Sequence, residues 1–257
     1  MIGAAEIALA HALADAAGTI VRRYFRQPIA VEQKSDATPV TIADRDAEAA
    51  MRALIAARFP QDGILGEEQD GVRLDSERIW VLDPIDGTKS FIAGIPLFGT
   101  LIALVERGVP LLGVIDQPIL RERWVGLVGG PSKFNGAPIR TRPCPDLGSA
   151  SLYCTTPDMF RGGDQAAFQR FKSAVRTVRH GADCYAYAML ASGFIDLVVE
   201  ADLKPYDYCA LVPVIEGAGG TITDWESRPL GLASDGRVIA AGDPGLGAKA
   251  RAVLAQH

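Results

Sequence analysis

Histidine is scarce in this sequence, and its cysteines are not arranged as metal-binding or redox pairs. Three histidines occur among 257 residues, so a Ser-His-Asp hydrolase or a histidine-rich zinc site has little to build on. The cysteines form no C-x-x-C pair and stand at Cys144, Cys154, Cys184 and Cys209. Scattered cysteines without a targeting segment predict reduced thiols in a cytoplasmic protein.

The sequence also lacks blocks of like charge and long apolar runs. Its net charge is −5 and no basic patch is visible, which argues against a nucleic-acid partner. No apolar run reaches the length of a membrane span. Glu6, His11 and Asp15 interrupt the apolar N-terminal segment, which has no basic leader, so we expect neither a signal peptide nor a membrane partner.

The composition that is present fits a globular protein. Apolar residues make up 48% of the chain and charged residues 22%, and the length allows one large domain or two closely packed ones. Thr141–Asp146 contains two prolines and is the best candidate boundary. We therefore expect an N-terminal α+β subdomain at residues 1–143 and a C-terminal α/β subdomain at residues 144–257.

Hydrophobic periodicity and turn residues predict alternating elements along the chain. Helices are expected at residues 4–26, 42–58, 165–174, 184–191 and 207–218, with a last one beginning at Asp243-Pro244. Strands are expected at residues 29–33, 64–65, 79–82, 97–106, 109–116, 122–128, 176–179, 194–200, 220–223 and 237–241. The three strands between residues 97 and 128 are joined by short turns, which is typical of an antiparallel meander.

The second predicted helix has a polar start and a mixed face. Thr41 and Asp44 have the spacing of a capping box. Asp44, Glu48, Met51 and Ile55 follow at helical spacing and share one face. Asp44 is either an acid favoured by the helix dipole or a functional carboxylate.

The stretch from Trp80 to Ser90 carries the strongest chemical pattern. The predicted strand at 79–82 ends in Asp83-Pro84-Ile85-Asp86, and Gly87-Thr88 follows. Proline and glycine favour a fixed turn, in which carboxylates can hold Mg²⁺ and backbone N–H groups can bind an anion such as phosphate. Alternatively, Asp-Pro and Asp-Gly are ordinary turn dipeptides.

Acidic residues also stand at the ends of other predicted elements. They are Glu67 after Gly66, Glu200 and Asp207. If Glu67 and Asp207 converge with the two aspartates of the 83–86 stretch, the cluster is unfavourable unless hard cations neutralise it. A carboxylate metal cluster beside an anion-binding turn is suited to phosphate-ester hydrolysis, and this chemistry needs no histidine.

Together these motifs resemble the inositol monophosphatase superfamily. The resemblance rests on Gly66-Glu67-Glu68, on the 83–88 stretch, and on Tyr206-Asp207 with the later Glu216–Gly220, in the family's order and spacing. It implies a layered αβαβα sandwich of the inositol-monophosphatase/fructose-bisphosphatase type. It also implies a lithium-sensitive phosphatase with two to three Mg²⁺ ions per active site, with Mn²⁺ as an alternative, and a homodimer.

The resemblance further implies roles for matching positions. The metal ligands would be Glu67, Asp83, the main-chain carbonyl of Ile85, Asp86 and Asp207. Glu67 would also face a third metal through water, and Thr88, hydrogen-bonded to Asp44, would orient the attacking water. The phosphate would be held by the N–H groups of Gly87 and Thr88. Lys34 would lie in a loop near the metals, or would be a solvated loop lysine.

Three local features favour the histidinol-phosphatase branch of the superfamily. These are Asp202–Tyr208, which contains Lys-Pro-Tyr-Asp-Tyr, then Lys89-Ser90-Phe91, and Gly181-Ala182-Asp183. Histidinol phosphate carries a cation, for which Asp183 and Glu200 would be partners. Asp183 could instead cap a helix, and Glu200 could meet a hydroxyl.

The resemblance therefore implies a Mg²⁺-dependent phosphomonoesterase that acts on L-histidinol phosphate. An inositol-1-monophosphatase, or another small-molecule phosphatase of the superfamily, is the alternative. A non-catalytic binder with this fold also stays open at the level of sequence.

Overall fold

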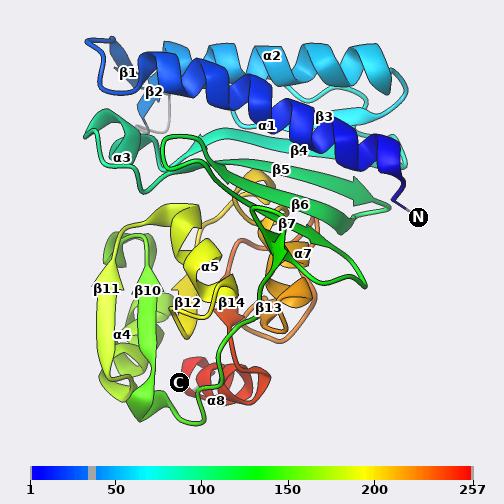
Figure 1. Ribbon diagram of the computed structural model, residues 1–257. Helices are drawn as coiled ribbons and strands as arrows, with labels where there is room; N and C mark the ends of the chain where they lie inside the picture. Colours follow the sequence, from blue (N-terminus) through cyan, green and yellow to red (C-terminus); the bar gives the residue numbers. More distant parts are fainter. Residues whose placement is uncertain (1, 34–38, 256–257) are drawn as a thin grey trace.

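The computed structural model describes residues 2–33 and 39–255, and its elements stack in five layers (Figure 1). The longer helices are α1 (Ala4–Tyr24), α2 (Ile42–Arg58), α4 (Gly163–Ala174), α5 (Asp183–Ala191), α7 (Leu211–Gly217) and α8 (Pro244–Leu254). From the top of Figure 1, α1 and α2 cover a seven-stranded sheet, α5 and α7 form the middle layer, a five-stranded sheet follows, and α4 and α8 close the stack. The expected αβαβα sandwich is confirmed.

The seven-stranded sheet runs in the order β3-β4-β5-β6-β7-β8-β9. Its strands are β3 (Gly63–Gly66), β4 (Arg78–Asp86), β5 (Gly99–Glu106), β6 (Val109–Gln117), β7 (Glu122–Leu127), β8 (Lys133–Phe134) and β9 (Ala137–Pro138). β3 and β4 are parallel, and β5 to β7 form the predicted antiparallel meander. A two-stranded ribbon, β1 (Val31–Gln33) with β2 (Pro39–Thr41), leads into α2.

The five-stranded sheet runs in the order β11-β10-β12-β14-β13. Its strands are β10 (Ser151–Cys154), β11 (Thr177–His180), β12 (Leu197–Glu200), β13 (Thr221–Thr223) and β14 (Val238–Ala241). β10 is parallel to β11 and β12, whereas β14 is antiparallel to both of its neighbours. Short helices α3 (Thr88–Ile92) and α6 (Pro205–Tyr208) follow β4 and β12.

Three apolar cores fill the spaces between the five layers, with the middle core on both sides of α5 and α7, and strand alternation explains them. In β4, Trp80 and Leu82 face the core under α1 and α2, whereas Ile79 and Val81 face α5 and α7 on the other side. The third core lies between the five-stranded sheet and the pair α4 and α8. Because both faces of β4 are buried, its end is held rigidly, and that end carries the aspartates.

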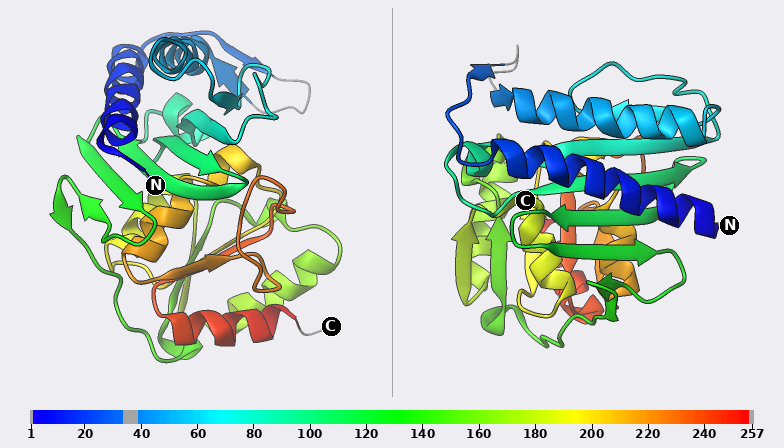
Figure 2. Two further views of the ribbon diagram at one scale, coloured as in Figure 1. Left: turned by 90° about the vertical axis from the view of Figure 1, so that its right-hand side faces the viewer. Right: turned by 45° about the horizontal axis from the view of Figure 1, so that its top comes forward.

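Helix α1 qualifies one sequence expectation. By length and composition alone it is long and apolar enough to cross a membrane, which the interrupted apolar run did not predict. In the fold its face with Leu9, Leu13 and Ala17 is fully buried against the seven-stranded sheet and α2 (Figure 2). The apolar residues of α1 therefore have a place in the core.

Two predicted boundaries are wrong for identifiable reasons. The strand at 79–82 continues to Asp86, because a bulge between Asp83 and Asp86 accommodates Pro84 without a ladder hydrogen bond. The single helix at 207–218 is broken into α6 and α7. Pro213 has no N–H to give to the carbonyl of residue 209, so one continuous helix is disfavoured there.

Other differences concern short strands. The strand predicted at 194–200 begins only at Leu197, and Phe194 is 67% exposed in the preceding turn. β10 was not predicted, since it has four residues and only alternate ones are buried. The division into subdomains 1–143 and 144–257 stays a prediction.

Candidate active site

Three aspartates from two distant segments meet where β4 ends. Asp83 and Asp86 lie at the end of β4, and Asp207 comes from α6. One carboxylate oxygen from each lies within 4.8 Å of those of the other two. Asp83 is buried, and the other two are partly buried. The convergence that spacing alone could not show is therefore present.

The pKa values of this cluster are raised. Burial, together with the charges of Glu67 and Asp86, raises the pKa of Asp83 well above its usual range. Burial and the Asp183 charge do the same for Asp86. Burial is also the main cause that raises the pKa of Asp207 to about 8. Such an excess of carboxylate oxygens suits a hard divalent cation, so the donor set fits Mg²⁺.

Glu67 joins this cluster from the neighbouring strand. β3 is parallel to β4 with Gly66 opposite Leu82, so Glu67 and Asp83 emerge at the same edge of the sheet. The Glu67 N–H donates to the Leu82 carbonyl at 3.2 Å. The Glu67 side chain shares a hydrogen bond with Asp83. Glu67 thus lies beside the three aspartates, as its expected role as a ligand requires.

The bulge of β4 orients the main chain between the aspartates. Asp83 Oδ1 accepts the N–H of Ile85 at 3.0 Å, and the Thr100 hydroxyl donates to the Pro84 carbonyl at 2.8 Å. The Ile85 carbonyl accepts the Thr88 hydroxyl at 3.1 Å. These bonds fix the carbonyl of Ile85 next to the carboxylates on both sides of it.

Asp44 and Thr88 meet as expected from the resemblance. The Thr88 hydroxyl lies 3.3 Å from Asp44 Oδ1, while Asp44 Oδ2 accepts the N–H of Thr41 at 2.9 Å and its hydroxyl at 2.5 Å. The capping box at the start of α2 is therefore confirmed. Burial raises the pKa of Asp44, although the Thr41 hydrogen bonds oppose this. Asp44 both caps α2 and faces the cluster.

Gly87 makes the turn between β4 and α3. Its φ is +91°, in the left-handed region that favours glycine, and a Cβ here would come within 2.8 Å of Asp183 Oδ2. α3 begins at the next residue, Thr88. The first N–H groups of a helix have no acceptor within it. The anion-binding role of this turn stays a prediction.

An acid-lined cavity of about 150 Å³ adjoins the cluster. It is lined by Asp86, Thr155, Met159, Asp183, Cys184, Tyr187, Glu200, Leu203 and Asp207. Burial raises the pKa of Asp183 to about 6 and that of Glu200 to about 7. Both expected substrate-binding acids therefore line one cavity with two of the metal-ligand candidates.

Asp183 does not cap a helix through its side chain, which was one open alternative. It is the first residue of α5, and Asp86 Oδ2 instead accepts the N–H of Cys184 at 2.5 Å. The Asp183 carboxylate accepts the Ser90 hydroxyl at 3.3 Å. Two of the three features that suggested the substrate, around Ser90 and Asp183, are thus in contact.

Two polar residues of the cavity were missed from the sequence. Glu200 Oε1 accepts the N–H of Thr155 at 2.8 Å, and its Oε2 accepts the Tyr187 hydroxyl at 2.9 Å. A tyrosine on an apolar helix and a backbone N–H after a short strand give no sequence signal of this role. They fix the orientation of Glu200.

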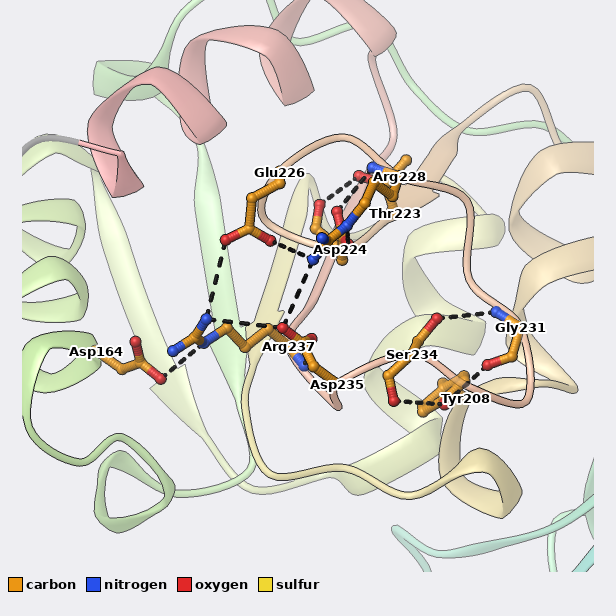
Figure 3. Close-up of polar contacts among 10 residues, drawn as sticks. All are labelled: Asp164, Tyr208, Thr223, Asp224, Glu226, Arg228, Gly231, Ser234, Asp235 and Arg237. Atoms are coloured by element: carbon orange, nitrogen blue, oxygen red, sulfur yellow. Dashed lines mark hydrogen bonds and ion pairs between the residues drawn. The ribbon is translucent and has the colours of Figure 1, made fainter.

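Hydrogen bonds hold the segment that carries Asp207 in place. The Lys204 N–H donates to Asp207 Oδ2 at 2.6 Å. Figure 3 shows the Tyr208 hydroxyl against Gly231 and Ser234; it donates to the Gly231 carbonyl at 3.1 Å. Tyr208 is fully buried in the core around α5 and α7, and it is not among the residues that line the cavity. Lys34, expected near the metals, lies outside the described residues.

Comparison with known proteins agrees with this fold. The model of the inositol monophosphatase family matches residues 5–257. The chain belongs to the inositol monophosphatase family. The family acts on small phosphate esters, and solved inositol monophosphatases share the fold described above.

Individual family members differ in their named substrates. The bifunctional phosphatase IMPL2 of Arabidopsis thaliana is 52% identical over 97% of this chain and 75% of its own length. The histidinol-phosphatase of Chlorobaculum parvum is 36% identical over 91% of this chain and 92% of its own. A solved inositol monophosphatase from Zymomonas mobilis has a TM-score of 0.91 and 50% identity, covering 99% of this chain and 100% of that one.

Proposed function

We propose that this protein is a Mg²⁺-dependent phosphomonoesterase of histidine biosynthesis that hydrolyses L-histidinol phosphate to L-histidinol and phosphate. The observation that carries this proposal is the pair Asp183 and Glu200, which line the cavity beside the aspartate cluster. Two carboxylates beyond the metal ligands suit an ester whose organic part is a cation. The likeness to a histidinol-phosphatase along 91% of the chain supports the same substrate.

In this proposal the metal ligands are Glu67, Asp83, the Ile85 carbonyl, Asp86 and Asp207. Two to three Mg²⁺ ions, or Mn²⁺ in their place, would stabilise charge on the phosphate oxygens and make water more acidic. The donor set is made of oxygen atoms, which both ions accept. We also expect a homodimer and a cytoplasmic location, as the family resemblance and the cysteines suggest; sedimentation velocity tests the first.

The protein's own residues then bind and orient the reactants. The N–H groups of Gly87 and Thr88 hold the phosphate at the start of α3. The Thr88 hydroxyl, with Asp44 behind it at 3.3 Å, accepts a hydrogen bond from the attacking water and directs its proton toward the Asp44 carboxylate. Asp183 and Glu200 hold the cationic end of the ester, so its phosphate points to the cluster.

An inositol-1-monophosphatase is the second candidate. The solved Zymomonas mobilis enzyme, at 50% identity, supports it. Glu200 has both oxygens engaged with Thr155 and Tyr187 and could equally accept a substrate hydroxyl. A neutral polyol would need hydrogen-bond partners in the cavity, but no second carboxylate.

The test compares kcat/KM for L-histidinol phosphate, inositol 1-phosphate and 3′-phosphoadenosine 5′-phosphate with Mg²⁺ present. We expect the highest value for histidinol phosphate. A clear preference for inositol 1-phosphate would replace the substrate and leave the metal chemistry intact. Absence of metal-dependent phosphate release from a broad panel of esters would instead favour a non-catalytic binder.

A further inference from the structure

Glu48, a buried carboxylate outside the proposed ligand set, binds the main chain just after Glu67. Glu48 lies on α2, one turn after Asp44, and its side chain is 0% exposed. Its Oε2 accepts the N–H of Glu68 at 2.8 Å, and its Oε1 accepts that of Gln69 at 3.1 Å. A charge is rarely buried in this way without partners, and here they include two main-chain groups just after Glu67.

Arg52, on the next turn of α2, contacts both Glu48 and the same main-chain segment. Its Nε lies 2.7 Å from Glu48 Oε1, and its Nη2 donates to the Gln69 carbonyl at 2.9 Å. The pair therefore binds both an N–H and a carbonyl of the same turn. Glu48 compensates the charge of Arg52, and together they attach residues 68–69 to α2.

Gly66, the residue before Glu67, also packs closely against Glu48. A Cβ at Gly66 would lie 2.2 Å from Glu48 Oε1, so the carboxylate occupies the space that any side chain at 66 would need. Both chain neighbours of Glu67 therefore lie against Glu48. Gly66 leaves room for the carboxylate because it has no Cβ, and Glu68 donates its N–H to it. The main chain at Glu67 has little freedom to move relative to α2.

We propose that Glu48 is a positioning residue that sets the place of Glu67 in the metal cluster. α2 then orients both halves of the chemistry, because Asp44 on the same helix holds Thr88. The inference rests on the proposed metal centre. A measurement of metal affinity separates this positioning role of Glu48 from a general role in folding.

The first test is Glu48→Gln in the full-length protein. Glutamine keeps the volume but offers a single acceptor oxygen, so one N–H of the turn and the charge of Arg52 lose their partner. Loss of a partner that orients a metal ligand commonly weakens metal binding by about 10–100-fold. We expect the apparent Kd for Mg²⁺, measured by titration calorimetry, to rise about tenfold, with a lower kcat at limiting Mg²⁺ that excess metal restores.

Ile55→Val is the matched control for loss of stability. Ile55 is a fully buried residue of the same helix, two turns further on, and it belongs to the apolar core under α1 and α2. It should lower the melting temperature and leave the Kd for Mg²⁺ unchanged. An equal rise in Kd in both variants would overturn the positioning role, because general destabilisation would then explain it.

A second perturbation approaches from the other side. Gly66→Ala inserts a Cβ against the Glu48 carboxylate and should raise the Kd for Mg²⁺ in the same direction. In a Glu48→Ala background the three atoms nearest to the added Cβ are removed, so Gly66→Ala should cost little further affinity. Additive losses in the double variant would contradict the contact.

If wild-type protein shows no heat of Mg²⁺ binding and no metal-dependent activity, the metal centre itself is wrong. If wild type binds Mg²⁺ and Glu48→Gln binds it equally tightly, only the role of Glu48 is wrong.

Discussion

Thr88 places one hydroxyl between two acceptors, the Asp44 carboxylate at 3.3 Å and the Ile85 carbonyl at 3.1 Å. A hydroxyl has one proton to donate and lone pairs that accept, so Thr88 can hold a water while it donates to one of these groups. We expect Thr88→Ala to lower kcat about 100-fold and to change KM much less, because the water loses its orientation. Steady-state kinetics on the preferred ester measures this split.

Thr88→Ser is the control, since serine keeps the hydroxyl and removes a methyl group. It should retain most of kcat. An unchanged kcat in Thr88→Ala would remove Thr88 from the proposed mechanism.

Asp183 distinguishes a charged substrate from a neutral one. Its carboxylate lines the cavity, and burial raises its pKa to about 6, so a substrate cation would meet a charge that water screens poorly. We expect Asp183→Asn to raise KM for histidinol phosphate about tenfold, the size of one lost charge-assisted hydrogen bond. KM for inositol 1-phosphate should change little.

The exposed Asp75→Asn removes the same charge away from the cavity and serves as the control. Equal effects of Asp183→Asn on charged and neutral esters would contradict the cation-binding role.

At the scale of elements, the sequence predicted what depends on local pattern. The capping box at Thr41 and Asp44 was found because it needs only three residues of spacing. The reach of β4 to Asp86 was missed, because a bulge is decided by pairing with β5. Glu48 was placed on the right face of α2, but its partners at residues 68 and 69 come from a segment twenty residues away.

Asp196 ties β10 and the connection before it to the start of β12. Its carboxylate, 1% exposed, accepts both Nε and Nη2 of Arg142 at 2.6 and 2.7 Å, and the N–H of Ser151 at 2.8 Å. Burial acts to raise the pKa of Asp196, but the bonds from Arg142 and Ser151 outweigh it and hold the pKa below its usual range. The connection before β10 and the start of β12 are thereby joined.

This pair predicts a dependence of stability on pH. A carboxyl whose pKa is depressed by folding contributes stability above its unfolded pKa, and this is lost as pH falls through the folded value. Asp196→Asn should lower the free energy of unfolding by about 2 kcal/mol at pH 7. The gap to wild type should narrow toward pH 3, as urea titrations of both proteins would show. A gap that stays constant with pH would contradict this assignment.

At the scale of the molecule, the cluster joins the two sheets. Asp83 and Asp86 belong to the seven-stranded sheet, whereas Asp207 follows β12 of the five-stranded one. The core around α5 and α7 also takes residues from both, such as Val81 and Val198. Sequence motifs predicted these residues as ligands, but only the packing of α5 and α7 between the sheets explains why they meet.

Because the proposed ligands and the middle core span both sheets, we expect the chain to unfold in one transition. We expect Mg²⁺ to raise its melting temperature. Trp225→Phe leaves Trp80 and Trp124, both in the seven-stranded sheet, as fluorescence probes. Their melting curve should coincide with far-UV circular dichroism, which reports all elements. A cation that binds only the folded state stabilises it by mass action, so saturating Mg²⁺ should raise both curves equally.

Adding Asp207→Asn to Trp225→Phe removes the one cluster aspartate that lies outside the seven-stranded sheet. The Mg²⁺-dependent rise in melting temperature should then largely disappear in both measurements, fluorescence and circular dichroism. The fluorescence curve should lose it although Trp80 and Trp124 lie far along the chain from residue 207. Retention of the full rise would mean that Mg²⁺ binds without Asp207. Two separate transitions in the absence of metal would mean that the two sheets fold as independent units, each with its own stability.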